Sequence, residues 1–222
     1  MPTSVFDIIG PVMVGPSSSH TLGAARLGSF AREFASEKIH KAKITLYGSF
    51  AETYKGHMTD VAIIGGLIGL RYDDEQLAGA KELAGQMGFD YEIVADNTPY
   101  YQGNTAKFEL LLDDGSIHTI VADSIGAGLV NINEIDGMYV DISGEYCSLV
   151  TVHADVAGMA ASITAVLAER AINIAFLKIY REERNKRAML VAQTDEDINE
   201  DILSKIKGIK GVGDAYIVGK LR

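Results

Sequence analysis

Residues 148–218 read SLVTVHADVAGMAASITAVLAERAINIAFLKIYREERNKRAMLVAQTDEDINEDILSKIKGIKGVGDAYIV. Short runs rich in β-branched residues alternate here with two segments whose apolar residues recur at helical spacing. The predicted strands are 148–153, 172–180, 187–193 and 215–218, and the predicted helices are 159–170 and 199–207. This β-α-β-β-α-β order is that of the ferredoxin-like split unit, in which two helices cover one face of a four-stranded sheet.

The sequence before this stretch predicts helices first and strands later. Helices are expected over 22–38, 61–70 and 74–87, and the second of these is apolar nearly all round, which indicates a helix buried on most sides. Strands are expected over 43–50, 91–95, 105–112, 116–123, 129–135 and 138–143. The economical arrangement places the helices on one face of a mainly antiparallel sheet. The chain is therefore predicted to be α+β, with domains 1–144 and 145–222 joined without a long linker.

Composition excludes several classes of function. The 222 residues carry a net charge of -10, so their surface repels nucleic-acid phosphates and anionic lipid. The longest apolar run, 61–70, is too short to span a bilayer, and the first residues lack the pattern of a signal peptide, so a cytoplasmic location is expected. A single cysteine, Cys147, excludes a disulfide within the chain and any metal site built from several of its thiolates, and we expect it to be a small buried strand residue.

The segment Gly15-Pro-Ser-Ser-Ser-His-Thr21 is the most unusual in the chain. Three serines and a threonine supply hydroxyl groups, and the start of the predicted helix supplies free N–H groups, so together they can hold a carboxylate. Ordinary helix capping would need only one of these hydroxyls. The whole run ending in His20 therefore favours a binding site.

A second polar segment, Lys55-Gly-His-Met-Thr-Asp60, precedes the buried helix. His57 lies in a loop that Gly56 makes flexible, and imidazole titrates near neutral pH, so it suits proton transfer. The alternative is a helix-entry loop capped by Thr59 or Asp60, in which His57 has no task. Spacing alone does not decide between the two.

In the second domain, the loop from His153 to Gly158 joins the first strand to the first helix. It brings His153 and Asp155 to a helix start, and Asn173 begins the next strand. These groups can hold the amine and carboxylate of a free amino acid. The alternative is a structural or dimerising module whose loop binds nothing.

The first domain resembles the β-chain of bacterial iron–sulfur L-serine dehydratases, which implies an allosteric-substrate-binding-like α/β domain. The matching pieces are Ser4-Val-Phe-Asp7, Gly15-Pro-Ser-Ser-Ser-His-Thr21, Tyr47-Gly-Ser49, Lys55-Gly-His-Met-Thr-Asp60 and Ser124-Ile-Gly-Ala-Gly128. The family converts L-serine to pyruvate and ammonia with a [4Fe-4S] cluster. The cluster cysteines belong to a partner α-chain, so the resemblance implies that this chain holds no metal and is inactive alone.

The resemblance also implies roles for individual residues. His57 matches the base that removes the α-proton of serine, and His20 is a second candidate for proton transfer. Thr59 is expected to line the pocket and orient the His57 ring. The expected substrate-binding residues are Ser17, Ser18, Ser19, Thr21 and Asn104. Family members often carry His-x-Asn before the strand at 105–112, whereas this chain reads Gln102-Gly-Asn104 and lacks the histidine.

The second domain resembles an ACT domain, a module that senses amino acids. It is similar to the serine-binding regulatory domain of phosphoglycerate dehydrogenase, which uses a His-x-Asn-x-Pro-Gly loop and an asparagine in the next strand. His153, Gly158 and Asn173 match that pattern, whereas Asp155 replaces asparagine and Ala157 replaces proline. The resemblance implies a regulatory amino-acid site and pairing of two ACT domains.

The sequence as a whole predicts the β-subunit of a two-subunit L-serine dehydratase that shares its active site with the α-chain. One alternative is a non-catalytic regulatory subunit that senses amino acids through its ACT domain. Another is a free-standing ACT sensor protein. If His57 and the Ser17–Thr21 loop face the cluster, the catalytic interpretation holds. If they face solvent, the regulatory alternative is favoured.

Overall fold

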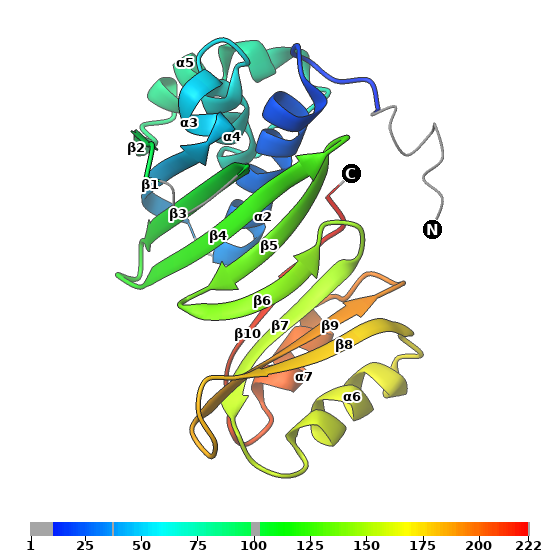
Figure 1. Ribbon diagram of the computed structural model, residues 1–222. Coiled ribbons are helices and arrows are strands. Elements are labelled where there is room, and N and C mark those ends of the chain that lie inside the picture. Colours follow the sequence, from blue (N-terminus) through cyan, green and yellow to red (C-terminus); the bar gives the residue numbers. More distant parts are fainter. Residues whose placement is uncertain (1–10, 37, 99–102, 222) are drawn as a thin grey trace. The chain divides into compact units, whose positions relative to one another are not determined.

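The computed structural model describes residues 11–36, 38–98 and 103–221 (Figure 1). The motif Ser4–Asp7 and the position Gln102 lie outside the described residues. The chain divides into two compact units, the first ending at Gly137 and the second spanning Met138–Leu221. The strand β6 (Met138–Ser143) is thereby grouped with the second unit, whereas the sequence placed it in the first domain. The domain limits 1–144 and 145–222 stay a prediction.

The first unit is built on a sheet whose strands follow the order β2-β1-β3-β4-β5. Their bounds are Asp90–Asp96 for β2, Ile39–Gly48 for β1, Asn104–Leu112 for β3, Ile117–Gly126 for β4 and Leu129–Ile135 for β5. Only the β1–β2 pair is parallel among these neighbours. The expected mainly antiparallel α+β fold is confirmed.

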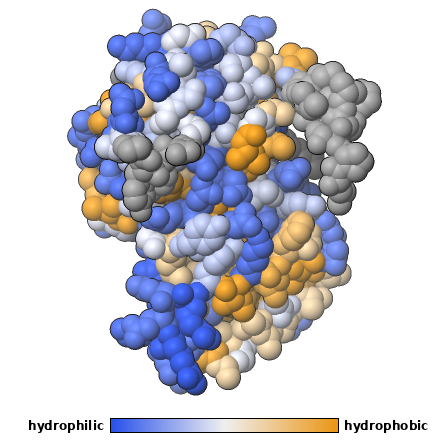
Figure 2. Space-filling view, in the orientation of Figure 1, coloured by the Kyte–Doolittle hydropathy of each residue, from blue (hydrophilic) through white to orange (hydrophobic). Residues whose placement is uncertain are grey.

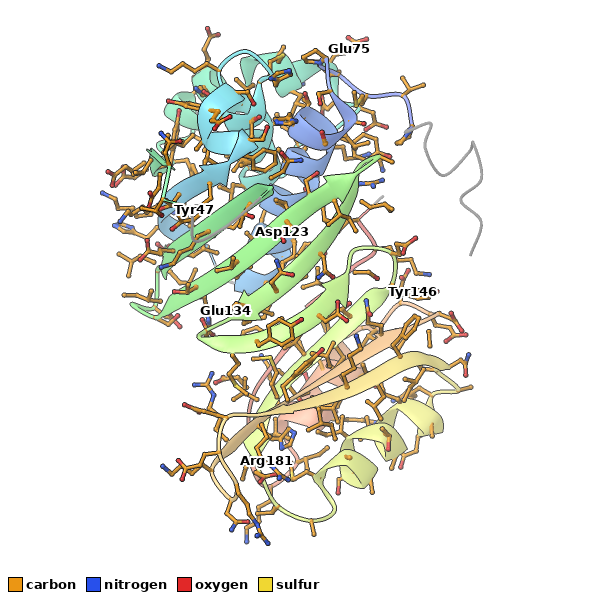
Figure 3. All side chains as sticks on the ribbon, in the orientation of Figure 1. Tyr47, Glu75, Asp123, Glu134, Tyr146 and Arg181 are labelled. Carbon is orange, nitrogen blue, oxygen red and sulfur yellow. The ribbon has the colours of Figure 1, made fainter. Side chains whose placement is uncertain are left out.

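The two faces of this sheet differ in polarity because side chains alternate along each strand. The buried face carries Ile44 and Leu46 from β1, Phe108 and Leu110 from β3, and Ile120 and Ala122 from β4. Helix α2 (Ala24–Ala35) runs behind β3, β4 and β5 in Figure 1. Asp123 on β4 and Glu134 on β5 alternate with the buried residues and therefore belong to the other, polar face (labelled in Figure 3).

Helix α4 (Thr59–Leu67) packs against α2 at very close range. A Cβ atom added to Gly66 would lie 2.2 Å from the Ala25 carbonyl oxygen, and one added to Gly28 would lie 2.3 Å from the Ile63 carbonyl oxygen. Only glycine permits this approach. The expectation that this helix is buried on most sides is confirmed, and the burial fixes the loop that carries His57 at its start.

Two expected elements of the first unit are interrupted by a different kind of local structure. The expected helix 74–87 is a 3-10 turn, η2 (Glu75–Gly79), followed by α5 (Ala80–Gln86). The expected strand 43–50 begins earlier and ends at Gly48, where the short helix α3 (Ser49–Thr53) follows. Gly48 adopts φ 55° and ψ -134°, a conformation open to glycine, and this breaks the strand there.

The second unit has the predicted β-α-β-β-α-β order. Its elements are β7 (Cys147–Ala154), α6 (Met159–Glu169), β8 (Ile174–Arg181), β9 (Arg187–Thr194), α7 (Glu200–Lys207) and β10 (Val212–Val218). The strands lie in the order β10-β7-β9-β8, and all neighbours are antiparallel. Leu149, Leu190 and Ala192 pack with Ile163 and Ile206 of the helices in one apolar core. The ferredoxin-like fold is confirmed.

Candidate active site

The serine-rich segment forms the first turn of a helix. A π-helix, η1 (Ser18–Gly23), runs directly into α2, and the Ser17 side chain accepts a hydrogen bond from the His20 backbone N–H at 3.1 Å. The helix thus begins at Ser18 and not at Leu22 as predicted. Single π turns within helices occur frequently at functional sites, because they shift side chains out of the regular helical pattern.

The His20 ring is held at both nitrogens. Nδ1 lies 3.0 Å from the Ser19 hydroxyl and Nε2 lies 2.9 Å from the Ser49 hydroxyl. The ring also packs edge-on against Phe50, with centroids 5.3 Å apart. Ser49 is placed by the Gly48 break, and its backbone N–H donates to the Gly103 carbonyl at 2.9 Å. The sequence offered Ser49 only as part of a matching motif and gave it no role.

His57 lies beside His20. The two ring centroids are 4.8 Å apart, and the Thr21 hydroxyl donates to the His57 carbonyl at 2.8 Å. His57 Nδ1 lies 3.3 Å from the Thr53 carbonyl oxygen. A carbonyl only accepts, so in this contact Nδ1 carries the proton and Nε2 keeps its lone pair. The structure therefore brings the two predicted polar segments together, although His20 and His57 are 37 positions apart in the sequence.

Space for a small molecule adjoins this histidine pair on two sides. His57 lines a pocket of about 440 Å³ together with Thr53, Tyr54, Lys55 and Gly56. Ser19 and Asn104 line a second pocket of about 450 Å³, with residues of the β4 end. Among the described residues, Ser18 Oγ and His57 Nε2 have no hydrogen-bond partner, so both atoms are available to a substrate.

Electrostatics keep His20 neutral near pH 7. Burial lowers the pKa of His20 below 6.5, and the charge of neighbouring His57 lowers it further, whereas a hydrogen bond from the ring to the Ser49 backbone raises it. A neutral imidazole can accept one hydrogen bond and donate another. His20 is thus suited to link the Ser19 and Ser49 hydroxyls.

Replacing His57 with glutamine should raise the pKa of His20, because this substitution removes the neighbouring charge. The pKa should remain below 6.5, because burial, the larger cause, persists. NMR titration of the His20 ring protons measures the change. His40→Gln is the control, since this imidazole is 67% exposed at the far end of β1. An identical His20 titration in His57→Gln and in the wild type would mean that the two rings do not interact in solution.

Two threonines predicted to act at the site are fully buried. Thr21 and Thr59 are both 0% exposed. The Thr59 hydroxyl has no hydrogen-bond partner among the described residues, so the predicted contact that would orient the His57 ring is not formed. The Thr53 carbonyl holds that ring instead. Because sequence position does not reveal burial, spacing alone did not separate these threonines from the accessible serines.

A polar network on β3, β4 and β5 continues the site. The Asn104 side-chain amide lies 3.4 Å from the Ser124 carbonyl, and the Ser124 hydroxyl donates to the Ser19 carbonyl at 2.8 Å. Asp123 accepts hydrogen bonds from Thr105 at 2.5 Å and from Asn133 at 2.7 Å. Asp123 was not among the site residues predicted from the sequence. Its place directly before the matching motif at Ser124, at the polar end of the predicted strand 116–123, was the signal that could have indicated it.

In the second unit, the predicted regulatory residues are largely engaged with their own chain. His153 is 5% exposed, with Nδ1 2.8 Å from the Ala154 carbonyl and Nε2 unpaired within the described part of the chain. Asp155 accepts from the Asn185 backbone N–H at 2.8 Å and forms an ion pair with Arg181. The Asn185 bond, and then Arg181, hold the pKa of Asp155 below its usual value. Gly158, with φ 92°, precedes α6 as expected of a helix-entry glycine.

Asn173 lies far from this loop within one chain. His153 pairs with Ala188 at one end of β9, whereas Ile174, which follows Asn173, pairs with Thr194 at the other end. The separation along β9 is roughly 20 Å at the rise of a β-strand. The Asn173 amide donates to Asp195 at 2.6 Å. One chain by itself therefore does not assemble the predicted amino-acid site.

The described residues offer no place for a metal. No group of three or more His, Cys, Asp or Glu side chains converges within 11–36, 38–98 and 103–221. Cys147 is 1% exposed, which confirms the expected buried strand residue, and burial raises the pKa of its thiol.

In the described part of the chain, none of the helices has the length and apolar character needed to cross a membrane.

Fold and site together define a two-domain chain with a histidine–hydroxyl site in the first domain and an ACT-type second domain. The serine dehydratase beta chain family matches residues 4–98, and the ACT domain family matches residues 148–211. The chain belongs to the L-serine dehydratase β-chain family: it is 39% identical to the probable L-serine dehydratase beta chain of Bacillus subtilis over 94% of both chains. It is also 32% identical to the L-serine dehydratase beta chain of Peptoniphilus asaccharolyticus, over 93% of this chain and 94% of that one.

A more distant relative is D-3-phosphoglycerate dehydrogenase of Synechocystis, 24% identical over 88% of this chain and 35% of that protein. Membership in a β-chain family implies an α-chain partner and a cofactor-bearing enzyme. It favours a two-subunit enzyme over a free-standing ACT sensor.

Proposed function

We propose that this chain is the β-subunit of a cytoplasmic L-serine dehydratase that converts L-serine to pyruvate and ammonia, with an active site completed by the α-chain. The observation that carries the proposal is the pairing of His20 and His57 at 4.8 Å, with His57 Nε2 unbonded among the described residues and pocket space beside it. Relatives that cover 94% of the chain support the same reading.

The chemistry requires two groups of the substrate to leave. Elimination removes the α-proton and the β-hydroxyl of serine as water, leaving 2-aminoacrylate, which takes up water to give pyruvate and ammonia. His57 Nε2 takes the α-proton, because its lone pair is free while Nδ1 donates to the Thr53 carbonyl. A base must lie within hydrogen-bond reach of the proton it removes.

We assign the cofactor to the α-chain. A [4Fe-4S] cluster needs several thiolates, and this chain has one buried cysteine. The cluster there would act as a Lewis acid toward the substrate hydroxyl. The residues of this chain supply the base and bind the rest of the substrate.

The hydroxyl groups of the site divide into two roles. Ser18, Ser19 and Asn104 are partly exposed and bind the substrate, and the Ser18 hydroxyl is free to donate to it because no described residue forms a hydrogen bond with it. Ser17 holds the His20 backbone, and Thr21 holds the His57 loop. Thr21 therefore positions the His57 loop from the interior, and neither Thr21 nor Thr59 contacts the substrate, because both side chains are fully buried.

Anaerobic co-expression of this chain with its α-chain tests the function. The purified pair should release pyruvate from L-serine. An assembled, iron-loaded pair that releases none would contradict the proposal. A purely regulatory subunit is the remaining alternative, and it predicts that substitutions at His57 leave turnover unchanged.

The regulatory half of the proposal concerns β8, an edge strand with exposed apolar side chains. Phe176, Leu177 and Ile179 are 48%, 43% and 49% exposed, and Figure 2 shows a hydrophobic patch along β8 beside the hydrophilic turn that follows it. An edge strand of this kind pairs readily with another chain. Antiparallel pairing with β8 of a second copy, about an axis near Leu177, would bring Asn173 of one copy to the Asp155 loop of the other. An amino-acid site would then form between two chains.

Replacing Leu177 and Ile179 with lysine should therefore convert the chain from a dimer to a monomer, because charge at a paired edge opposes association. Sedimentation of the full-length chain measures this. Ile117→Lys is the matched control, since this residue is 67% exposed on β4 of the first unit. A wild-type chain that stays monomeric at high concentration would count against ACT pairing. Calorimetric titration with L-serine then asks whether the dimer binds the effector.

A further inference from the structure

Asp123 holds a carboxylate in a fixed position at the edge of the candidate active site. It lies on β4 and lines the pocket of about 450 Å³ with Ser19, Asn104 and Ser124. Oδ1 accepts from the Thr105 hydroxyl and Oδ2 accepts from the Asn133 amide. Both oxygens are thereby anchored, and the carboxylate is aligned before any ligand arrives.

The charge of Asp123 is not compensated by the residues that anchor it. Thr105 and Asn133 are neutral donors, and no cationic side chain forms an ion pair with Asp123 within the described residues. Several other acidic side chains of the described residues form ion pairs: Asp60 with Lys81, Asp141 with Lys178, and Asp155 with Arg181. An ionised carboxylate has about four acceptor positions, and two are used here. Asp123 is thus a ready acceptor for a positively charged group.

Ser19 links this pocket to His20, one member of the histidine pair. The Ser19 hydroxyl contacts His20 Nδ1, and the Ser19 carbonyl accepts from Ser124, the neighbour of Asp123 on β4. Asn104 contacts the Ser124 carbonyl from the other side. A molecule in the pocket therefore meets neutral hydroxyl and amide groups at Ser19 and Asn104, and a negative charge at Asp123.

We propose that Asp123 binds the α-ammonium group of the substrate. The inference rests on the proposed function, in which the substrate is a zwitterionic 2-amino acid. The serine hydroxyls and the Asn104 amide take its carboxylate, and Asp123 takes its ammonium group, so the two ends of the zwitterion are distinguished. Asp123 is accordingly the residue that selects amino acids over hydroxy acids of the same shape.

Asp123→Asn in the assembled enzyme tests this role. A hydrogen bond to a charged group is stronger than a neutral one, so the KM for L-serine should rise by roughly 10- to 100-fold while kcat changes by less than about threefold. 3-Hydroxypropanoate carries the carboxylate and hydroxyl of serine but no amine. Its inhibition constant should be the same in the variant and the wild type, because it makes no ion pair to lose.

Glu134→Gln is the matched control. It removes the same charge from the same face of the sheet, on the neighbouring strand, and should leave the KM unchanged. Should Asp123→Asn impair assembly, Asn133→Ala keeps the charge but removes one anchor, and a smaller rise in KM is expected. An unchanged KM in that variant would also overturn the inference.

The outcomes separate this inference from the proposed function. If the wild-type pair releases pyruvate and Asp123→Asn has a normal KM, the inference fails and the function stands. If the wild-type pair releases no pyruvate, the function itself fails. If Asp123→Asn weakens co-purification with the α-chain but leaves the KM of the assembled fraction normal, Asp123 binds a cation of the partner chain, and the inference is overturned.

Discussion

The assembled enzyme carrying His57→Ala should lose roughly 10²–10⁴-fold in kcat, the usual contribution of a general base. The α-proton of serine is a weak acid, and the charge that develops as it leaves must pass to a base in direct contact. His57 Nε2 is unbonded within the described residues, and its ring is held by the Thr53 carbonyl and packed against His20. Folding, α-chain association and iron content should be unchanged, because His57 is only half-buried. Steady-state kinetics with measured iron content provide the test.

Two companion variants make the assignment specific. Ser18→Ala should raise the KM more than it lowers kcat, because the free Ser18 hydroxyl contributes to substrate binding in the ground state. His20→Ala tests the alternative general base, since His20 is the other imidazole at the site. A near-normal kcat in assembled His57→Ala would end the assignment and move the role of base to His20 or to the α-chain.

The isolated chain should contain no iron and release no pyruvate from L-serine. Cluster ligation needs several thiolates, whereas Cys147 is the only cysteine and is buried, with its thiol pKa raised by that burial. Within the described residues no other group of metal-binding side chains converges. The base alone leaves the hydroxyl of serine a poor leaving group, so the loss of activity should be complete. Iron analysis and a pyruvate assay on the purified chain measure both quantities.

Addition of the α-chain supplies the control for this prediction. Activity should appear only in the fractions where the two chains co-elute. A brown, active preparation of the β-chain alone would falsify the assignment of the cluster to the partner. Colour without activity would indicate iron bound at a place outside the proposed site.

Several features of the fold and the site were predicted from the local sequence pattern alone. The ferredoxin-like second domain was predicted from the order of short strands and helices, because each element is specified by its own hydrophobic spacing. The burial of α4 was likewise predicted from its continuous apolar character, and Cys147 from its place in an apolar strand. The functional segments containing His20 and His57 were found because their residue types are unusual together.

The contacts between these segments were decided by the tertiary structure. His20, Ser49 and His57 meet because the Gly48 break and the close packing of α2 on α4 bring separate turns together. No local pattern encodes a contact between residues so far apart in sequence.

The tertiary structure also decided which of several similar polar residues are buried. Ser18 and Thr21 are three positions apart, yet one hydroxyl is accessible and the other is 0% exposed. Asp123 became a candidate only once the alternation of β4 put it beside Thr105 and Asn133 at a pocket. His153 and Asn173, which the predicted motif combines in one site, lie at opposite ends of β9, because helix α6 carries the chain back across the sheet before β8 begins. Sequence determines the elements and their chemistry, whereas long-range packing determines which side chains share a site and which are enclosed, since contact and exposure depend on residues distant along the chain.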